Sequence, residues 1–274
     1  MYTIESINRQ LKERLIAYLQ ADYHILNDSL IEARFQLLNN DNVIANEPRL
    51  EGSKRYPPGE TYENMHIPDA SKKLLDQLSK IPNSGVWPKP RKHQEKAIEI
   101  FLEDNDDLIV ATGTGSGKTE TFLYPLFGSL ALENKNPNTL EMSGVRCLLL
   151  YPMNALVNDQ LTRLRGILGN KDCKKIFKEV RGRHVTFGTY TSKTQYPGPK
   201  TPKKEKDLIK KLQGTYLPND SDTSQKLKKH NLYPAKDIAT FTDSECSVNP
   251  EDAELYTRHE IQKSPPDILI TNYS

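Results

Sequence analysis

Hydrophobic and polar positions change their period several times along this chain, and each period predicts a different kind of element. Over residues 1–40, apolar side chains recur every three or four positions, which predicts amphipathic helices. The apolar face of the first helix is expected to be buried, and it consists of Ile4, Ile7, Leu11, Leu15, Tyr18 and Leu19. Ser29 and Glu32 form a capping box that predicts the start of another helix. Prolines and glycines then dominate residues 41–70, which predicts an extended connector.

A short helix is expected at 71–80, and from Trp87 onward short apolar runs alternate with amphipathic stretches of helical length. The expected helices are 91–103, 117–131 and 154–168, and the expected strands are 108–111, 145–151, 184–190 and 267–271. Strands separated by helices of this length predict an α/β fold with a parallel sheet and right-handed crossovers. The chain therefore divides into a helical region with its proline-rich connector (1–86) and an α/β domain (87–274).

Residues 195–264 interrupt this alternation with a change of charge. Lysines dominate from Gln195 to Ala235, and carboxylates dominate from Lys236 to Glu260. We interpret the segment as a charged, solvated surface insertion. A basic arm that touches nucleic-acid phosphates is the alternative interpretation.

Composition excludes several classes of protein. No apolar run approaches the roughly 20 residues of a membrane span, and the N-terminus lacks the layout of a secretory signal. Cys147, Cys173 and Cys246 are too far apart to predict a disulfide framework or a metal site. We therefore expect a protein of the reducing cytoplasm. The net charge of +2 indicates no particular partner by itself.

The candidate chemistry follows the strand expected at 108–111. Three glycines at 113, 115 and 117 permit turns that are closed to other residues, so backbone N–H groups can surround a phosphate. The next helix directs its positive N-terminal end at the anion. Lys118 is predicted to bind the β- and γ-phosphates, and the Thr119 hydroxyl is predicted to ligate Mg²⁺. Thr112 stands where the strict pattern has glycine, so this is a variant phosphate loop.

Gln94 lies on the helix before the loop, 17 residues ahead of Ala111. Its amide has both donor and acceptor groups, so it can bond N6 and N7 of adenine; an ordinary surface glutamine is the alternative. Trp87 either stacks on the base or fills the core beside the proline-rich turn. The predicted ligands are ATP and Mg²⁺. The predicted nucleotide-binding residues are Arg91, Gln94, Thr112, Gly113, Thr114, Gly115, Ser116, Gly117, Lys118, Thr119 and Glu120.

Gln94, the phosphate loop and three later segments, 151–160, 188–192 and 266–273, occur in a definite order. Together they resemble the first RecA-like domain of a superfamily-2 DExD/H-box helicase. The glutamine segment is similar to that of RecQ-like helicases, although Pro90 stands where that family has an aromatic residue. The chain also resembles RecQ-like and Ski-like bacterial helicases of DNA repair or phage defence. The resemblance covers 87–194 and 265–274, and it implies a RecA-like domain that binds ATP and nucleic acid.

The resemblance also implies contacts with a nucleic-acid strand at three strand ends. The residues concerned are Pro152, Asn154, Thr191, Ser192, Thr271 and Asn272. Their short polar groups suit phosphate and sugar contacts, although caps and turn formers explain each of them singly. Such contacts predict binding that tolerates any base sequence and weakens with salt. The resemblance to RecQ-like and Ski-like helicases also favours DNA over RNA and movement in the 3′-to-5′ direction.

Hydrolysis needs further groups, namely an aspartate for Mg²⁺, a glutamate for the attacking water and arginines for the phosphoryl group. In this family the two acidic residues form a D-E-x-H or D-E-x-D motif, and no such motif follows an apolar strand within these 274 residues. We therefore expect the N-terminal part of an ATP-dependent helicase or translocase, truncated before the DExH motif and inactive alone. The second RecA-like domain would come in cis or from a neighbouring reading frame. The alternative is a truncated ATP- and nucleic-acid-binding module without hydrolysis, whereas a small-molecule kinase leaves Gln94 unexplained. The incomplete sheet is expected to have an open edge.

Overall fold

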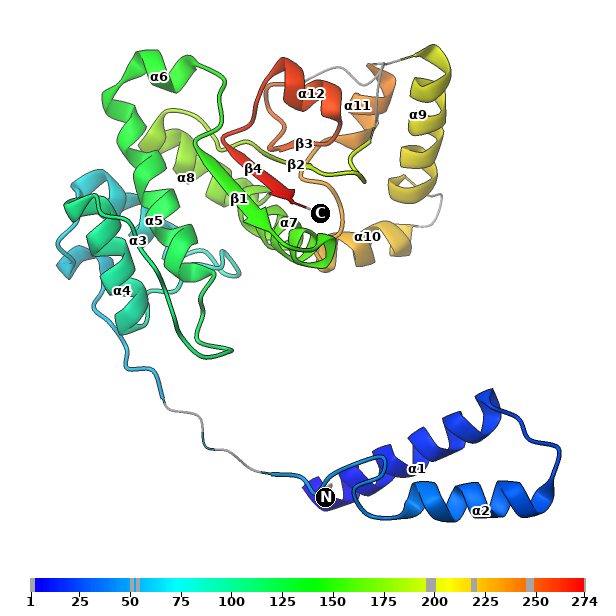
Figure 1. Cartoon of the computed structure of the whole chain (residues 1–274). Helices are drawn as coiled ribbons and strands as arrows, with labels where there is room; N and C mark the ends of the chain where they lie inside the picture. Colours follow the sequence, from blue (N-terminus) through cyan, green and yellow to red (C-terminus); the bar gives the residue numbers. More distant parts are fainter. Residues whose placement is uncertain are drawn as a thin grey trace. The chain divides into compact units, whose positions relative to one another are not determined.

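In a computed structural model, the chain forms two compact units, Met1–Arg55 and Tyr56–Ser274 (Figure 1). The structure describes residues 3–49, 52, 55–195, 201–217, 221–244 and 249–273, so Cys246 lies outside the described residues. The boundary expected after residue 86 is corrected, because Tyr62 and Leu74 are buried in the core of the second unit. Residues 56–86 therefore belong to the α/β unit.

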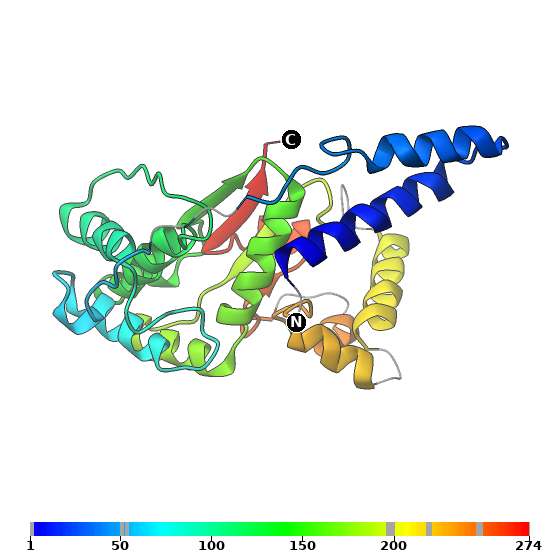
Figure 2. The ribbon, with the colours of Figure 1, turned by 90° about the horizontal axis from the view of Figure 1, so that it is seen from below.

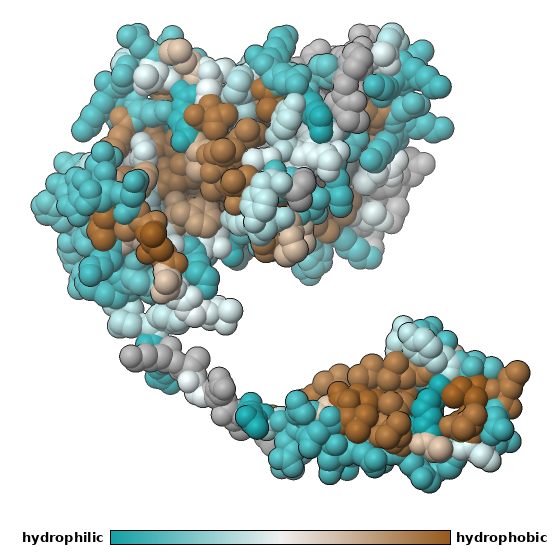
Figure 3. All heavy atoms as spheres, in the orientation of Figure 1, coloured by the Kyte–Doolittle hydropathy of each residue, from teal (hydrophilic) through white to brown (hydrophobic). Residues whose placement is uncertain are grey.

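The first unit is a hairpin of two helices, α1 (Ile4–Asp22) and α2 (Asp28–Asn39). The side chain of Asn27, and not Ser29, caps α2 by accepting a hydrogen bond from the Leu30 amide. Ile16 is the one buried residue in these two helices, so the prediction of a buried face on α1 is wrong for this unit by itself. The exposed residues of that face are Ile4, Ile7, Leu11, Leu15 and Tyr18 (Figure 3). Each helix of a hairpin has only one partner, so most of its surface stays uncovered.

The second unit begins with a layer of helices. Its first elements are η1 (Tyr62–Asn64), α3 (Asp69–Ser79), α4 (Lys92–Glu99), the π-helix η2 (Ile100–Asp104), α5 (Glu120–Ala131), η3 (Leu132–Lys135) and α6 (Pro137–Glu141). Helices α3 and α4 both pack against α5. Helix α5 is buried along most of its length, and Phe127 stacks edge-on against Phe177 of α8 (Lys171–Arg181). This packing fixes the start of α5, where the phosphate loop ends.

A parallel sheet forms the centre of the second unit, which confirms the predicted α/β class. Its strands are β1 (Cys147–Tyr151), β2 (Phe187–Tyr190), β3 (Glu254–Leu255) and β4 (Ile268–Asn272), in the order β1-β4-β2-β3. Ile270 of β4 pairs with Leu149 on one side and with Thr189 on the other. Helix α7 (Asn154–Leu168) follows β1 and has the predicted bounds. The carboxyl ends of β1, β2 and β4 therefore lie at one edge of the sheet.

The strand expected at 108–111 is wrong. Residues 105–113 form no regular element, and the Ile109 side chain is 98% exposed. A strand needs a neighbouring backbone to pair with, and β1, an edge strand, pairs only with β4 among the described residues. Leu148 and Leu150 of β1 are both more than half exposed, and Figure 3 shows apolar surface in this region. Apolar sequence alone therefore does not make residues 108–111 a strand.

Residues 195–264 are more than a solvated surface insertion. They contain α9 (Pro202–Tyr216), α10 (Ser221–Lys229), α11 (Ile238–Asp243) and α12 (Arg258–Lys263), which lie on the side of the sheet away from α3 and α4 (Figures 1 and 2). A small apolar core joins α9 to α11 through Leu208, Leu212, Ile238 and Phe241. Lys236 is buried and pairs with Asp252 and with Glu260, whose carboxylate is 2.9 Å from its Nζ. The acidic run is thus partly neutralised by Lys236 inside it and by Arg165 and Lys178 from outside it, and β3 joins the sheet.

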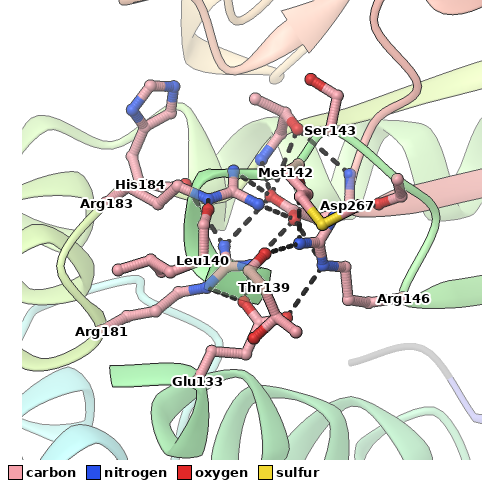
Figure 4. A network of polar contacts seen from close by, with 12 residues as sticks. Glu133, Thr139, Leu140, Met142, Ser143, Arg146, Arg181, Arg183, His184 and Asp267 are labelled. Carbon is pink, nitrogen blue, oxygen red and sulfur yellow. Dashed lines mark hydrogen bonds and ion pairs between the residues drawn. The ribbon is translucent and has the colours of Figure 1, made fainter. Parts of the chain in front are cut away.

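A buried ionic network holds the amino ends of the strands (Figure 4). Asp267, just before β4, accepts hydrogen bonds from both terminal nitrogens of Arg181, at 2.8 and 3.0 Å, and from Arg183 and the Thr186 amide, each at 2.9 Å. Burial alone would raise the pKa of the Asp267 carboxyl, but Arg181 and Arg183 outweigh it and hold that pKa below its usual value. Paired guanidinium–carboxylate bonds of this kind are strong and directional.

No described helix is long and apolar enough to cross a membrane.

Replacing Asp267 with asparagine should destabilise the fold by about 3–5 kcal/mol at pH 7, because the buried guanidinium of Arg181 and the partly buried one of Arg183 lose this counter-charge. Because the pKa of Asp267 is lowered by folding, its carboxylate contributes fully to stability when the pH is above the pKa of the unfolded state, near 3.9. The contribution is lost as the pH falls through the lower pKa of the folded state. Urea unfolding of both proteins at pH 7 and pH 3 measures the difference, which should shrink at pH 3. Asp76→Asn, which breaks an exposed pair with Lys80, is the control and should change stability by less than about 1 kcal/mol. A difference that is equal at both pH values would contradict the assignment.

The open edge and exposed apolar face of β1 should cause self-association. Leu148→Lys places a charge on that face and should shift the onset of association to a higher protein concentration. Sedimentation velocity across a concentration series measures the protein concentration at which association begins. Leu232→Lys, an exposed apolar residue in the segment after α10, is the matched control and should have little effect. Equal effects of the two substitutions would exclude β1 as the associating surface.

Candidate functional site

The phosphate loop is a compact turn that leads into α5. Gly115 and Gly117 have φ of 72° and 81°, the left-handed region that favours glycine. The Thr112 and Ser116 hydroxyls lie 2.7 Å apart, and Ser116 is fully buried. A Cβ on Gly117 would collide with the side-chain amide of Gln94 and lie 2.9 Å from a carboxylate oxygen of Glu120. The glycines are therefore required by the shape of the loop.

Lys118 reaches back across the loop. Its Nζ donates hydrogen bonds to the carbonyl oxygens of Thr112 and Gly113, both at 2.8 Å. An ammonium group has three donors, so one remains free for a ligand. The charge of Lys118 is thus already held against the backbone at the start of the loop.

The backbone amides of residues 113–120 donate no hydrogen bond in the described part of the chain. The Thr119 hydroxyl likewise has no described hydrogen-bond partner. A series of unpaired N–H groups beside a lysine and a helix N-terminus has the donors that a polyphosphate needs. The residues present therefore fit a polyphosphate group.

The structure brings Arg91 and Gln94 to the phosphate loop. The Gln94 side chain is buried, its Oε1 accepts the Arg91 amide at 2.8 Å, and its Nε2 donates to the Gly117 carbonyl at 2.9 Å. The Arg91 guanidinium donates to the Gly115 carbonyl at 2.9 Å. The amide oxygen and nitrogen of Gln94 each retain capacity for one more hydrogen bond. Gln94 is therefore not an ordinary surface residue, because it joins α4 to the loop.

Tyr56 is a neighbour of the loop that the sequence analysis missed. Its ring centre lies 5.2 Å from the Arg91 guanidinium carbon and 5.1 Å from the His93 ring centre, and its hydroxyl is close to Gly113. The backbone after Tyr56 is fixed to the start of α4, because the Gly59 amide donates to the Pro90 carbonyl at 2.7 Å. The signal in the sequence was an aromatic residue directly before two prolines and a glycine.

Trp87 does not fill the core. Its side chain is 65% exposed, so that interpretation is wrong. The Tyr62 hydroxyl donates to the Trp87 carbonyl at 2.7 Å, and the Trp87 amide donates to the Tyr124 hydroxyl at 3.2 Å. The backbone at this position is thus held in place while the indole remains in solvent.

The other candidate residues gather at the carboxyl edge of the sheet. Asn272 donates its side-chain amide to the Asn154 side-chain oxygen at 3.1 Å, and the Thr271 hydroxyl bonds the Tyr190 carbonyl. A small cavity of about 160 Å³ opens beside Asn154 and Thr191. Lys193 and Arg165 also line it. Pro152 and Ser192 are exposed near these strand ends, so the six predicted residues lie at or just after the carboxyl ends of β1, β2 and β4.

The described residues contain no preformed group of three or more histidine, cysteine, aspartate or glutamate side chains for a metal ion. Burial raises the pKa of the Cys147 thiol to about 11 and that of the Cys173 thiol to about 12. Both thiols are therefore protonated at neutral pH, and a metal-ligating or nucleophilic role requires the thiolate.

Comparison with known proteins agrees with this geometry. Residues 91–209 match the model of the DEAD/DEAH box helicase family. The chain is 40% identical to the Druantia protein DruE of Escherichia coli, over 97% of this chain and 16% of that protein. It is 33% identical to the probable ATP-dependent RNA helicase MJ0669 of Methanocaldococcus jannaschii, over 41% of this chain and 31% of the relative. It is 29% identical to the ATP-dependent RNA helicase DBP7 of Kluyveromyces lactis, over 56% of this chain and 20% of the relative.

The chain spans a third or less of the length of each of these relatives. The matched region contains Arg91, Gln94, the phosphate loop and the strand ends after β1 and β2. Its parallel sheet and covering helices are those of a RecA-like domain. The second unit of this chain therefore carries a DEAD/DEAH box helicase domain at residues 91–209.

Proposed function

We propose that this chain is the ATP-binding N-terminal part of an ATP-dependent DExD/H-box helicase or translocase. The observation that carries the proposal is the row of unpaired amides from residue 113 to 120 beneath the ammonium of Lys118. The bound ATP would supply the free energy of its terminal phosphate bond. Lys118 and the loop amides would hold the phosphates, and Thr119 would hold Mg²⁺.

Adenine recognition falls to Gln94 and Tyr56 in this proposal. Gln94 keeps one free donor and one free acceptor position, which match N7 and N6 of adenine. Tyr56 supplies an aromatic ring beside Arg91. Pro90, the residue before Arg91, stands where the resembling helicases carry an aromatic residue, so Tyr56 would take the place of that ring. Arg91 and Gln94 are positioned by their bonds to the loop, so base and phosphates would be read by one connected surface.

The nucleic-acid strand would cross the carboxyl edge of the sheet. The N-terminus of α7 at Asn154 and the hydroxyl and amide groups after β2 and at the end of β4 would contact phosphates and sugars. Lys193 adds a positive charge to the same edge. Contacts of this kind do not read base sequence, and their strength falls with salt. Oligothymidylate and oligouridylate, titrated side by side, distinguish the DNA strand that we propose from an RNA strand.

A binding module without turnover is the second candidate, and one observation favours it for this chain. No D-E-x-H or D-E-x-D sequence follows an apolar strand within residues 1–274. We propose that the isolated chain binds ATP but does not hydrolyse it, and that turnover belongs to a longer protein with a second RecA-like domain. Phosphate release by the isolated chain, stimulated by an oligonucleotide, would contradict this division.

Lys118→Ala should weaken binding of the Mg²⁺ complex of AMP-PNP, a slowly hydrolysed ATP analogue, by roughly 10- to 100-fold. The basis is that hydrogen bonds to charged groups contribute about 1.5–3 kcal/mol. Fluorescence titration of the whole chain with a labelled analogue measures the dissociation constant. Lys96→Ala removes an exposed lysine from α4 and should leave it unchanged. Tight binding by Lys118→Ala would disprove the phosphate-loop assignment.

Tyr56→Ala should weaken AMP-PNP binding by roughly 5- to 100-fold, because stacking of a base on an aromatic ring contributes about 1–3 kcal/mol. Tyr56→Phe keeps the ring and should bind almost normally. Tripolyphosphate has no base, so its affinity should be the same for all three proteins, as competition titration will show. A parallel loss of tripolyphosphate binding in Tyr56→Ala would instead mean that the residue only shapes the loop.

A further inference from the structure

Helices α5 and α7 are joined by an ion pair between Arg163 and Glu120. Glu120 is the first residue of α5, directly after Thr119, and Arg163 lies in the second half of α7. The Arg163 guanidinium donates to the Glu120 carboxylate at 2.6 Å. Among the described residues, this is the ion pair that connects these two helices. The Glu120 side chain is 14% exposed, so its charge is only partly screened by water.

The carboxylate of Glu120 lies against the phosphate loop. Its second oxygen is close to Gly117, at the same point where the Gln94 amide bonds the Gly117 carbonyl. A negative charge at this position repels a polyphosphate in the loop, since Coulomb energies at a partly buried site are several times larger than in water. Arg163 neutralises that charge and holds the carboxylate by its other oxygen.

Arg163 is also part of the helix that begins at the carboxyl edge of the sheet. Asn154 starts α7 and accepts a hydrogen bond from Asn272, the last residue of β4. Arg163 lies nine residues further on, roughly 13 Å along a helix with a rise of 1.5 Å per residue. Val157 and Leu164 of α7 are buried, so the helix is packed along its length and transmits a displacement of either end as a rigid element.

We propose that the Glu120–Arg163 ion pair couples the phosphate loop to the strand-contacting end of α7. The proposal rests on the function proposed above. It assigns the pair a positioning role that connects the two binding regions. Arg163 on Glu120 lowers the repulsion between that carboxylate and a polyphosphate in the loop, so a bound polyphosphate favours the paired arrangement, which sets the position of α7. A strand held at Asn154 fixes α7 and thereby keeps Arg163 on Glu120. Each ligand then favours the other, because coupling between two sites is reciprocal.

The coupling is measured as a ratio of dissociation constants for Mg²⁺–AMP-PNP, without and with a saturating 12-nucleotide oligothymidylate. The whole chain is used, and the wild-type ratio should be at least about fivefold, within the usual range for coupled sites. Glu120→Gln, Arg163→Gln and the double variant should each bring the ratio to within about twofold of one. Arg163→Lys keeps the charge and should retain most of the ratio. The two single effects should not add in the double variant, because both remove the same contact.

Lys178→Gln is the control, because it breaks a partly exposed ion pair of α8 with Glu251 that touches neither helix. Its ratio should equal that of the wild type. A purely structural role for Glu120 and Arg163 would lower the melting temperature and leave the ratio unchanged, and that result overturns the inference. A wild-type ratio of one overturns it as well, even if both ligands bind. If the wild-type chain binds neither ligand, the proposed function fails first, and the coupling fails with it.

Discussion

The buried carboxylate of Asp267 is the contact on which the sheet depends. It accepts guanidinium donors from Arg181, at the end of α8, and from Arg183, in the loop before β2. A buried charge is tolerated only when its partners are complete, and here they come from different elements. The pairing therefore fixes the start of β4 between β1 and β2. Because all strands are parallel, fixing their amino ends also fixes where their carboxyl ends meet.

The two candidate binding regions depend on different supports. The strand edge at Asn154 and Asn272 is placed by the register of the sheet, which the network around Asp267 holds. The phosphate loop is held by α4 and α5 instead, through Gln94 and through the lysine that closes the turn. No strand precedes the loop among the described residues, although open α/β sheets usually present ligands at strand ends. Among the described residues, the Glu120–Arg163 pair joins α5 to α7, and Glu133, just after α5, pairs with Arg181 of the network around Asp267.

Sequence patterns succeeded where the structure is local. The bounds of α7 agree with the prediction, because its period is that of a helix and Pro152 precedes it. The predictions failed where a partner decides the outcome. Ile109 lies in an apolar run but is solvent-exposed, because a strand exists only with a neighbour. Leu11 of α1 and Trp87 are exposed for a similar reason, since apolar character does not say which surface is available to cover a side chain.

By itself, the sequence determined the glycine-rich loop with its lysine, the parallel α/β class and the order of the polar strand ends. These follow from short-range properties, namely the conformational freedom of glycine, the charge of Lys118 and the period of apolar residues. Tertiary structure alone decided that Tyr56 lies beside Arg91, that Gln94 bonds Gly117, and that Lys236 is buried between Asp252 and Glu260. Those contacts join residues far apart in the chain, and which of them form depends on how helices and strands fill space together.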